Sequence, residues 1–121
     1  LWNQVFPDEP SRNEPTALIR TKLDMQRESF LVCLCDGYLV GTVMAGFDGV
    51  RGWVHKVAAH PDYRRRGIAT HLMAAAEKAL AGKGCRKLNL QVRAGNDSAV
   101  RFYQAAGYSV EDRTSMSKLL G

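Results

Sequence analysis

The chain has 121 residues and a formal net charge of +5, and 45% of its residues are hydrophobic and 24% charged. This length predicts one domain over residues 1–121, and the balance is that of a globular rather than a disordered protein. Every strongly apolar stretch is interrupted within a few residues by Gly, Thr or Asp, so we expect neither a membrane-spanning segment nor a membrane partner. No leader peptide is visible, and we therefore expect a cytoplasmic protein.

The composition also limits the ligands. An excess of positive charge favours an anionic partner, and a nucleic acid, a membrane surface and a phosphorylated cofactor all satisfy it. The three cysteines, Cys33, Cys35 and Cys85, form neither a metal-binding knuckle nor a C-x-x-C redox pair. We predict that they are buried free thiols in a reducing compartment, and that the protein holds no metal ion.

The first quarter of the chain is predicted to form a loop and a helix. Residues 1–15 are rich in Pro, Asp, Glu and Asn, which favours a loop after the end of a helix near Phe6. Residues 16–27 predict a helix, because Leu18 and Met25 lie seven residues apart, on one side of it.

Three strands should follow. Two apolar runs, 30–35 and 38–45, are separated by Asp36 and Gly37, and this dipeptide is a strong signal for a tight hairpin because both turn residues take positive φ. After a second Asp-Gly pair, residues 52–59 predict a third strand.

A helix, a strand and a second helix come next. Apolar residues recur at helical spacing over residues 68–80, and Gly82 and Gly84 supply C-terminal stops. Residues 87–93 alternate like a strand. Asn96 should begin the second helix, which ends at Gly107.

Two last strands are predicted, over residues 108–111 and 114–120. Antiparallel strands followed by alternating strands and helices indicate an α+β fold with a mixed sheet, not a doubly wound one.

The segment between the third strand and the first of these helices has the composition of an anion site. A helix N-terminus carries unpaired N–H groups and about half a positive charge. Gly67, at the helix start, has no Cβ and permits close approach of a ligand, and Ala69 is nearly as small. Arg64, Arg65 and Arg66 precede them, so this turn is predicted to bind an anion such as a pyrophosphate, although a solvated arginine loop has the same composition.

Two motifs resemble those of the GNAT acetyltransferases. Arg64, Gly67 and Ala69 match the signature R/Q-x-x-G-x-G/A, and the segment from Asn96 to Tyr108 is similar to N-x-x-A-x-x-x-Y-x-x-x-G-F/Y. The resemblance extends from about residue 30 to the end, and residues 41–49 are similar to a small bacterial YpeA-like branch.

The resemblance implies the GNAT acyl-CoA N-acyltransferase fold. Its sheet is mixed, mostly antiparallel and splayed between strands four and five, and helices flank it. Leu1 and Trp2 resemble the end of the family's first helix, so the family's first strand is expected to be missing. The implied co-substrate is acetyl-CoA, and the implied reaction is direct transfer of acetyl to a primary amine without an acetyl-cysteine.

The resemblance also implies cofactor contacts. Backbone N–H groups of the turn would hold the CoA pyrophosphate, and the third strand would pair with the pantetheine arm as an added strand would. The Val57 N–H would polarise the thioester carbonyl. The implied cofactor-binding residues are Val57, Ala58, Ala59, Arg64, Arg65, Arg66, Gly67, Ile68, Ala69, Thr70 and Asn96.

Asn96 and Tyr103 each have two interpretations. They lie seven residues apart and hence on one helix face. The resemblance implies that Asn96 hydrogen-bonds the pantetheine and that Tyr103 protonates the departing thiolate. From the residues alone, Asn96 is an N-cap and Tyr103 a core aromatic.

One candidate is available for the group that removes the amine proton. Relatives that acetylate histones carry Glu at the position of Trp53, and those that acetylate ribosomal N-termini carry Glu at the position of Gln91; neither residue here can ionise. His55 is a candidate catalytic base on the third strand, on the same alternation as Trp53 and Val57, with a structural histidine as the alternative. His60 and His71 receive no chemical role.

Two other functions stay open at this level. A CoA-binding regulatory domain would keep the pyrophosphate turn and lack acceptor chemistry. A nucleic-acid-binding module would use the arginines, but no stripe of stacking aromatics accompanies them, so we expect no nucleic acid partner. The acceptor, a small molecule or a peptide amine, and the oligomeric state, a homodimer included, are not specified.

Overall fold

The computed structural model describes residues 30–35, 37–61 and 67–121. Three predictions fall outside these residues. They are the helix over residues 16–27, the helix end near Phe6 and the absence of the family's first strand. The chain divides into two compact units, residues 1–91 and 92–121, and each is described by itself.

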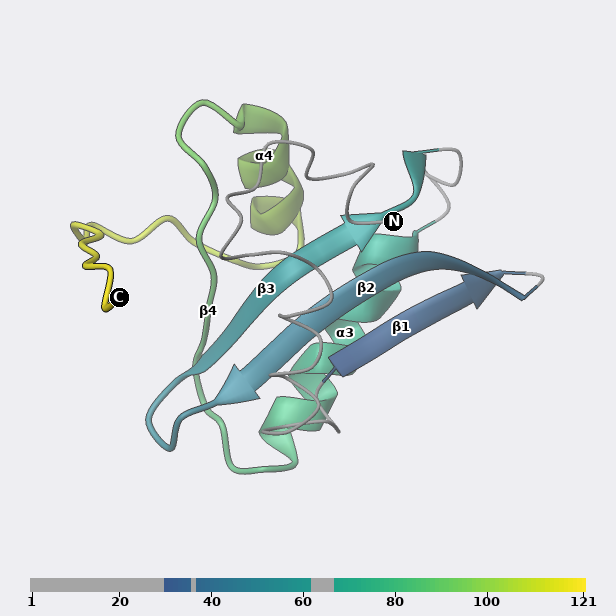
Figure 1. The fold of residues 1–121 in the computed structure, drawn as a ribbon, viewed down its shortest axis with the longest axis horizontal. Coiled ribbons are helices and arrows are strands. Elements are labelled where there is room, and N and C mark those ends of the chain that lie inside the picture. The colour runs from purple at the N-terminus through teal and green to yellow at the C-terminus, as the bar shows by residue number, and fades with distance from the viewer. Residues whose placement is uncertain (1–29, 36, 62–66) are drawn as a thin grey trace. The chain divides into compact units, whose positions relative to one another are not determined.

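The described residues of the first unit form a four-stranded sheet with one helix packed on it (Figure 1). The sheet order is β1-β2-β3-β4, in which β1 to β3 pair antiparallel and β4 is parallel to β3. The helix α3 (Ile68–Ala81) lies behind the sheet in Figure 1. The mixed sheet of the α+β fold is thus confirmed. The strands are β1 (Phe30–Cys35), β2 (Tyr38–Phe47), β3 (Gly52–Ala59) and β4 (Leu88–Asn89).

The turns explain why the strands end where they do. Gly37 has φ of +82°, which suits the predicted tight hairpin between β1 and β2. In the next turn, Asp48 Oδ1 accepts hydrogen bonds from the N–H groups of Val50 and Arg51, both at 2.8 Å. These bonds, with that from Arg51 first, lower the pKa of Asp48. Such a side-chain turn is typical of Asp between strands.

The core of the first unit lies between the sheet and α3. Gly41 on β2 permits their close contact, because a Cβ there would lie 2.5 Å from Ile68 Cγ2 and 2.8 Å from Leu72 Cδ1. Burial of these apolar side chains is the main force that holds the helix on the sheet. The buried apolar residues are Val40, Val43, Ala45, Val54, Ala58, Ile68, Leu72, Met73, Ala76 and Leu80.

The strand predicted over residues 87–93 is much shorter in the structure. It pairs with β3 only where Gly52 meets Leu88 and Trp53 meets Asn89. Beyond these pairs β4 ends, whereas β3 continues to Ala59. The two strands therefore diverge after two pairs, in keeping with a splayed sheet.

The second unit contains one helix, α4 (Asp97–Ala105). Gly107, with φ of +99°, follows its end, and Tyr108 N–H donates to Tyr103 C=O at 2.9 Å, as expected for a left-handed glycine stop. The strands predicted over residues 108–111 and 114–120 are wrong, because no strand forms within residues 92–121. A strand needs a partner for its backbone groups, and this unit contains only a helix besides the extended tail.

Candidate functional site

The N-terminus of α3 has the backbone geometry of an anion site. Gly67 is its N-cap residue with φ of +73°, in the left-handed region that glycine adopts without strain. Among the described residues no side chain caps this end of the helix, and its first turn contains no acidic residue. The N–H groups that begin every helix are thus not satisfied by a capping side chain here.

The described residues at the start of α3 differ in exposure. Gly67 and Thr70 are exposed, Ala69 is half-buried, and Ile68 points into the core. The His71 ring lies nearest to Gly67, since a Cβ on Gly67 would be 3.8 Å from its Cδ2. Arg64, Arg65 and Arg66 lie outside the described residues, so their predicted contribution stays a prediction.

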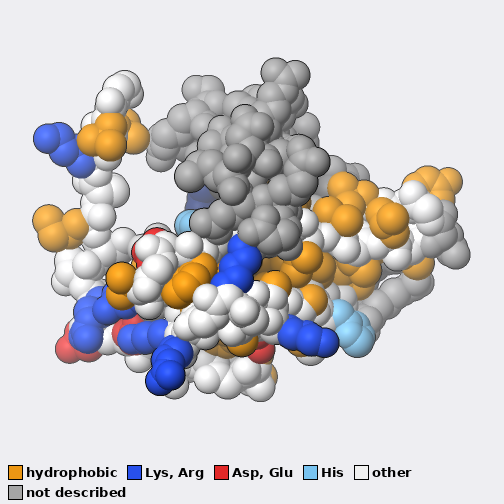
Figure 2. Space-filling model, turned by 90° about the horizontal axis from the view of Figure 1, so that it is seen from below, with side chains coloured by type: hydrophobic (Ala, Val, Ile, Leu, Met, Phe, Trp, Pro, Cys, Tyr) orange, Lys and Arg blue, Asp and Glu red, His pale blue; other side chains and the backbone are white. Residues whose placement is uncertain are grey.

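The described surface of the first unit is positively charged. It contains two acidic residues against six basic ones, a net charge of +4. Figure 2, which draws both units, shows more Lys and Arg than Asp and Glu on the face seen from below. A field of this sign attracts a phosphorylated ligand. The acidic residues are Asp48 and Glu77, and the basic ones are Arg51, Lys56, Lys78, Lys83, Arg86 and Lys87.

A β-bulge interrupts β3 at the predicted carbonyl-polarising residue. Met44 pairs with His55, but Thr42 pairs with Ala58, so Lys56 and Val57 together oppose the single residue Val43. Lys56 has φ of +53° and is the one non-glycine residue with positive φ in the described part of the chain. Backbone strain of this kind is concentrated at functional sites.

A side chain from β2 holds the bulge. Thr42 is 2% exposed, and its Oγ1 donates a hydrogen bond of 2.9 Å to the Lys56 carbonyl oxygen. The sequence interpretation missed both Thr42 and the bulge. Thr is an ordinary strand residue, and Lys carries no signal for positive φ, so no pattern in the sequence marks this site.

The bulge corrects one prediction about His55. Trp53, His55 and Ala58 pair with Gly46, Met44 and Thr42, which are even-numbered residues on one face of β2. That face is opposite to the one on which Gly41 meets α3. The extra residue shifts the alternation of β3 by one, so the prediction that Val57 shares the alternation of His55 is wrong. His55 is exposed, and Trp53 is half-buried.

The other predicted cofactor-binding residues of β3 lie in the bulge (Val57) and directly after it (Ala58 and Ala59). Val57 and Ala59 are half-buried, and Ala58 is 1% exposed. The last residue of β3 that pairs with β4 is Trp53, which lies before the bulge, so these residues do not pair with β4.

In the second unit, Asn96 caps α4. Its Oδ1 accepts a hydrogen bond from Ala99 N–H at 3.3 Å and another from Ser98 Oγ at 3.2 Å. Asp97 lies in the first turn of the helix, where a negative charge is favourable. The interpretation of Asn96 as an N-cap is confirmed.

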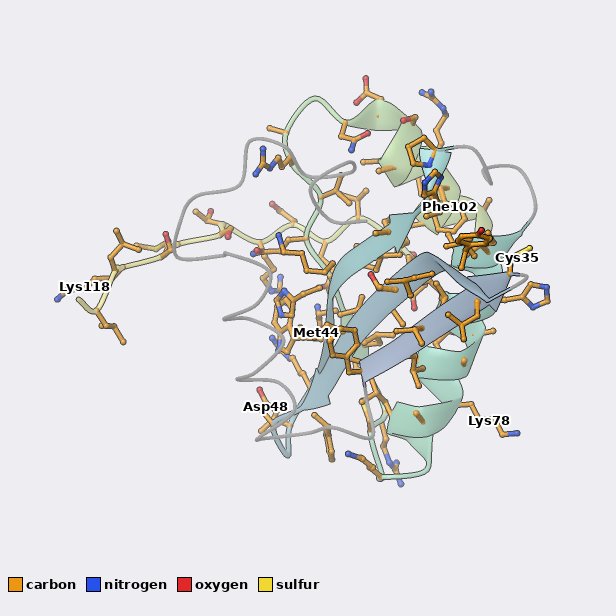
Figure 3. All side chains as sticks on the ribbon, turned by 45° about the vertical axis from the view of Figure 1, so that its right-hand side comes forward. Cys35, Met44, Asp48, Lys78, Phe102 and Lys118 are labelled. Carbon is orange, nitrogen blue, oxygen red and sulfur yellow. The ribbon has the colours of Figure 1, made fainter. Side chains whose placement is uncertain are left out.

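Tyr103 lies among aromatic rings of its own unit. Its ring contacts Phe102 edge-on at 5.0 Å between centroids, and Tyr108 at 5.8 Å. Phe102 is labelled in Figure 3. Burial raises the pKa of Tyr103 above its ordinary value of 10.0, so the phenol keeps its proton at neutral pH.

Two further findings concern other ligands. The described residues contain no group of three or more His, Cys, Asp or Glu side chains that could hold a metal ion. Cys33, Cys35 and Cys85 are half-buried thiols that form no disulfide. None of the described helices is long and apolar enough to cross a membrane.

Comparison with known proteins gives the family. Residues 1–108 match the sequence profile of the "Acetyltransferase (GNAT) family". An acetyltransferase of Yersinia pestis (strain Pestoides F) is 42% identical over 108 residues, which are 89% of this chain and 77% of that protein. An acetyltransferase of Sodalis glossinidius is 42% identical over 100 residues, covering 83% and 70%.

Solved structures agree on the fold. Ard1 from Thermoplasma volcanium superposes with a TM-score of 0.80 at 24% identity, covering 92% of this chain and 73% of that one. AAC(6')-Iy, in complex with the bisubstrate analogue CoA-S-monomethyl-acetylneamine, gives a TM-score of 0.79 at 22% identity, covering 98% and 86%. With a profile match over most of its length and relatives above 40% identity, this chain belongs to the GNAT acetyltransferase family and is an N-acetyltransferase.

Proposed function

We propose that the protein transfers acetyl from acetyl-CoA directly to a primary amine. The observation that supports this most is the start of α3, where a left-handed Gly67 precedes a helix with no side-chain cap and no acid in its first turn. Such an N-terminus accepts a pyrophosphate through main-chain N–H groups. The bound CoA of the fold neighbour AAC(6')-Iy is a property of that protein, and it is consistent with this assignment.

In this proposal the pantetheine arm lies along β3 beyond Trp53, where pairing with β4 has ended. The main chain of Val57, Ala58 and Ala59 hydrogen-bonds the arm as a neighbouring strand would. The Val57 N–H, within the bulge, donates to the thioester carbonyl oxygen. That hydrogen bond strengthens as the oxygen gains negative charge in the transition state.

The chemical step is nucleophilic acyl substitution. The neutral amine nitrogen forms a bond to the carbonyl carbon, the carbon–sulfur bond breaks, and its electron pair stays on sulfur. The phenol of Tyr103 gives its proton to that thiolate. The ammonium proton leaves to a base, for which His55 is the candidate because Trp53 and Gln91 cannot ionise.

The acceptor is a small-molecule or peptide amine. Among the fold neighbours are aminoglycoside acetyltransferases, so aminoglycosides belong in the first set of candidates together with polyamines, amino acids and peptides. Because those structures are below 25% identical to this chain, they guide the choice of compounds and no more.

The test is an acetyl-transfer panel with two readouts. Release of CoA thiol is followed in solution, and mass spectrometry looks for an acceptor heavier by one acetyl group. We expect an acetylated amine and no acetyl group on Cys33, Cys35 or Cys85. CoA binding without acetylation of any amine would favour a regulatory CoA-binding domain, and a cysteine adduct that passes its acetyl to the acceptor would refute direct transfer.

A further inference from the structure

The hydrogen bond from Thr42 to the bulge has a consequence for the neighbouring amide. Within the described residues Thr42 is the one polar side chain that is buried, and its hydroxyl is used to hold the Lys56 carbonyl oxygen at 2.9 Å. Thr42 lies two residues before Met44, which is labelled on β2 in Figure 3. The bond thus joins β2 to the first residue of the bulge in β3.

The Lys56 carbonyl and the Val57 N–H belong to the same peptide unit. This unit is planar and trans, so its C=O and N–H point in opposite directions. Thr42 attracts the oxygen toward β2, and the Val57 N–H must therefore point away from β2. In the sheet order β2-β3-β4, that is the side of β3 from which β4 has diverged.

The backbone of Lys56 would not hold this orientation unaided. A φ of +53° is unfavourable for a residue with a Cβ, and rotation about the Lys56 N–Cα bond, which would swing the Lys56–Val57 peptide, would relieve it. The Thr42 hydroxyl opposes that rotation by fixing the oxygen. Valine would fit a strand at this position as well as threonine does. The hydrogen bond that orients the Lys56–Val57 peptide therefore explains why a buried threonine lies here.

We propose that Thr42 is a positioning residue for acetyl transfer. Its hydroxyl fixes the Lys56–Val57 peptide so that the Val57 N–H is directed at the thioester carbonyl oxygen. The inference rests on the proposed function, in which this N–H polarises the carbonyl, and it adds the residue that aims the donor.

The amide proton of Val57 reports on this directly by NMR. In the wild type we expect its resonance to move downfield when acetyl-CoA binds, and to move much less when CoA binds, because CoA has no carbonyl group. Thr42→Val removes the hydroxyl and keeps the branched shape. In this variant the difference between the two ligands should disappear, while the affinity for CoA stays within about three-fold because the pyrophosphate contacts are main-chain groups of α3.

Activity gives the second readout. Thr42→Val should lower kcat by about ten-fold or more, since loss of an oxyanion donor altogether costs about 10²-fold. Thr42→Ser keeps the donor and should restore both the NMR difference and most of kcat. Leu80→Val, a core substitution on α3, is the control for a general loss of stability. Thr42→Ala removes the same donor and carries the comparison if Thr42→Val does not fold.

The outcomes separate the two proposals. If the wild type shows no difference between acetyl-CoA and CoA at Val57, the carbonyl-polarising role of this amide fails, and the role of Thr42 fails with it. If the wild type shows the difference and Thr42→Val keeps it, the proposed function stands and the positioning role of Thr42 is wrong.

Discussion

The two helices in the described part of the chain begin in opposite ways. The first turn of α3 has a left-handed Gly67 before it, no capping side chain and no acid, whereas α4 is capped by the Asn96 side chain and carries Asp97 in its first turn. Every helix leaves N–H groups unpaired at this end. In α4 the Asn96 side chain accepts a hydrogen bond from one of them, that of Ala99. In α3 we propose that an external anion accepts them.

We expect the starts of α3 and α4 to contribute to different steps, cofactor binding and acetyl transfer. The α3 turn offers main-chain groups, and we therefore expect substitutions there to change cofactor affinity. The α4 helix offers side chains, Asn96 and Tyr103, and we expect substitution of Tyr103 to change kcat. Each substitution below tests one side of this division.

The largest effect on rate is expected from Tyr103→Phe, which keeps the ring and its edge contacts with Phe102 and Tyr108. Loss of the proton donor should lower kcat by about 10²-fold. The affinity for CoA should hardly change, and the free energy of unfolding should fall by roughly 1 kcal/mol or less. Steady-state kinetics on the acceptor from the panel, with thermal unfolding as a control, make the measurement. Full activity would mean that Tyr103 is only a packed aromatic.

The pH profile provides a check on the same group. Burial raises the pKa of Tyr103, so the protonated phenol is favoured by folding. Its contribution to stability is complete below the unfolded pKa near 10 and is lost as the pH rises through the higher folded pKa. Ionisation of Tyr103 should accordingly cause no fall in the wild-type kcat below pH 10.0. A fall that starts at lower pH and vanishes in Tyr103→Phe would contradict the shift.

An intermediate effect is expected when α3 is made to resemble α4. Thr70→Glu places an acid in the first turn, at an exposed position. It should weaken CoA binding by about ten-fold through repulsion of the pyrophosphate, yet stabilise the unliganded protein by about 0.3–1 kcal/mol through the helix dipole. Thr70→Gln is the uncharged control. Calorimetry measures the loss of CoA affinity, and thermal unfolding measures the gain in stability. A loss of stability with unchanged CoA affinity would contradict the placing of the pyrophosphate at the start of α3.

The smallest effect is expected at Asn96. Asn96→Ala removes the acceptor of the Ala99 hydrogen bond and should cost about 1 kcal/mol of unfolding free energy. Asn96→Asp keeps an oxygen acceptor and adds a favourable charge, so its stability should equal that of the wild type. A drop in CoA affinity in Asn96→Asp, despite this stability, would support the amide N–H donor role toward pantetheine. Equal affinity in both variants would leave Asn96 as a cap alone.

The sequence predicted the parts of the fold that are set locally. The Asp-Gly turns predicted the β1–β2 hairpin and the start of β3. Helical spacing predicted α3 with its glycine stops, and Asn96 and Gly107 predicted the start and the end of α4. The strands predicted over residues 108–111 and 114–120 do not form, because a strand exists only where a partner pairs with it. The same reason explains β4, which is two residues long although seven residues alternate.

For the site, the sequence predicted the glycine turn but not the bulge. A motif of small residues before a helix is visible in the chain, since it depends on residue types at fixed spacing. The bulge at Lys56 and Val57 depends on how β3 pairs with β2, and the role of Thr42 depends on that bulge. These features can be recognised only when the register of the two strands is known.

The central claim, that the uncapped start of α3 binds the CoA pyrophosphate, is tested most directly by calorimetry with CoA on a matched pair of variants. Gly67→Glu places a carboxylate at the turn, and Gly84→Glu places the same side chain at a glycine with φ of +92° just past the other end of the helix. Both variants bear similar backbone strain. Because like charges about 4 Å apart near a protein surface repel by about 4 kcal/mol, Gly67→Glu should lose about 10²-fold or more in CoA affinity. Gly84→Glu should bind CoA as the wild type does. Equal affinity in the two folded variants would contradict the claim.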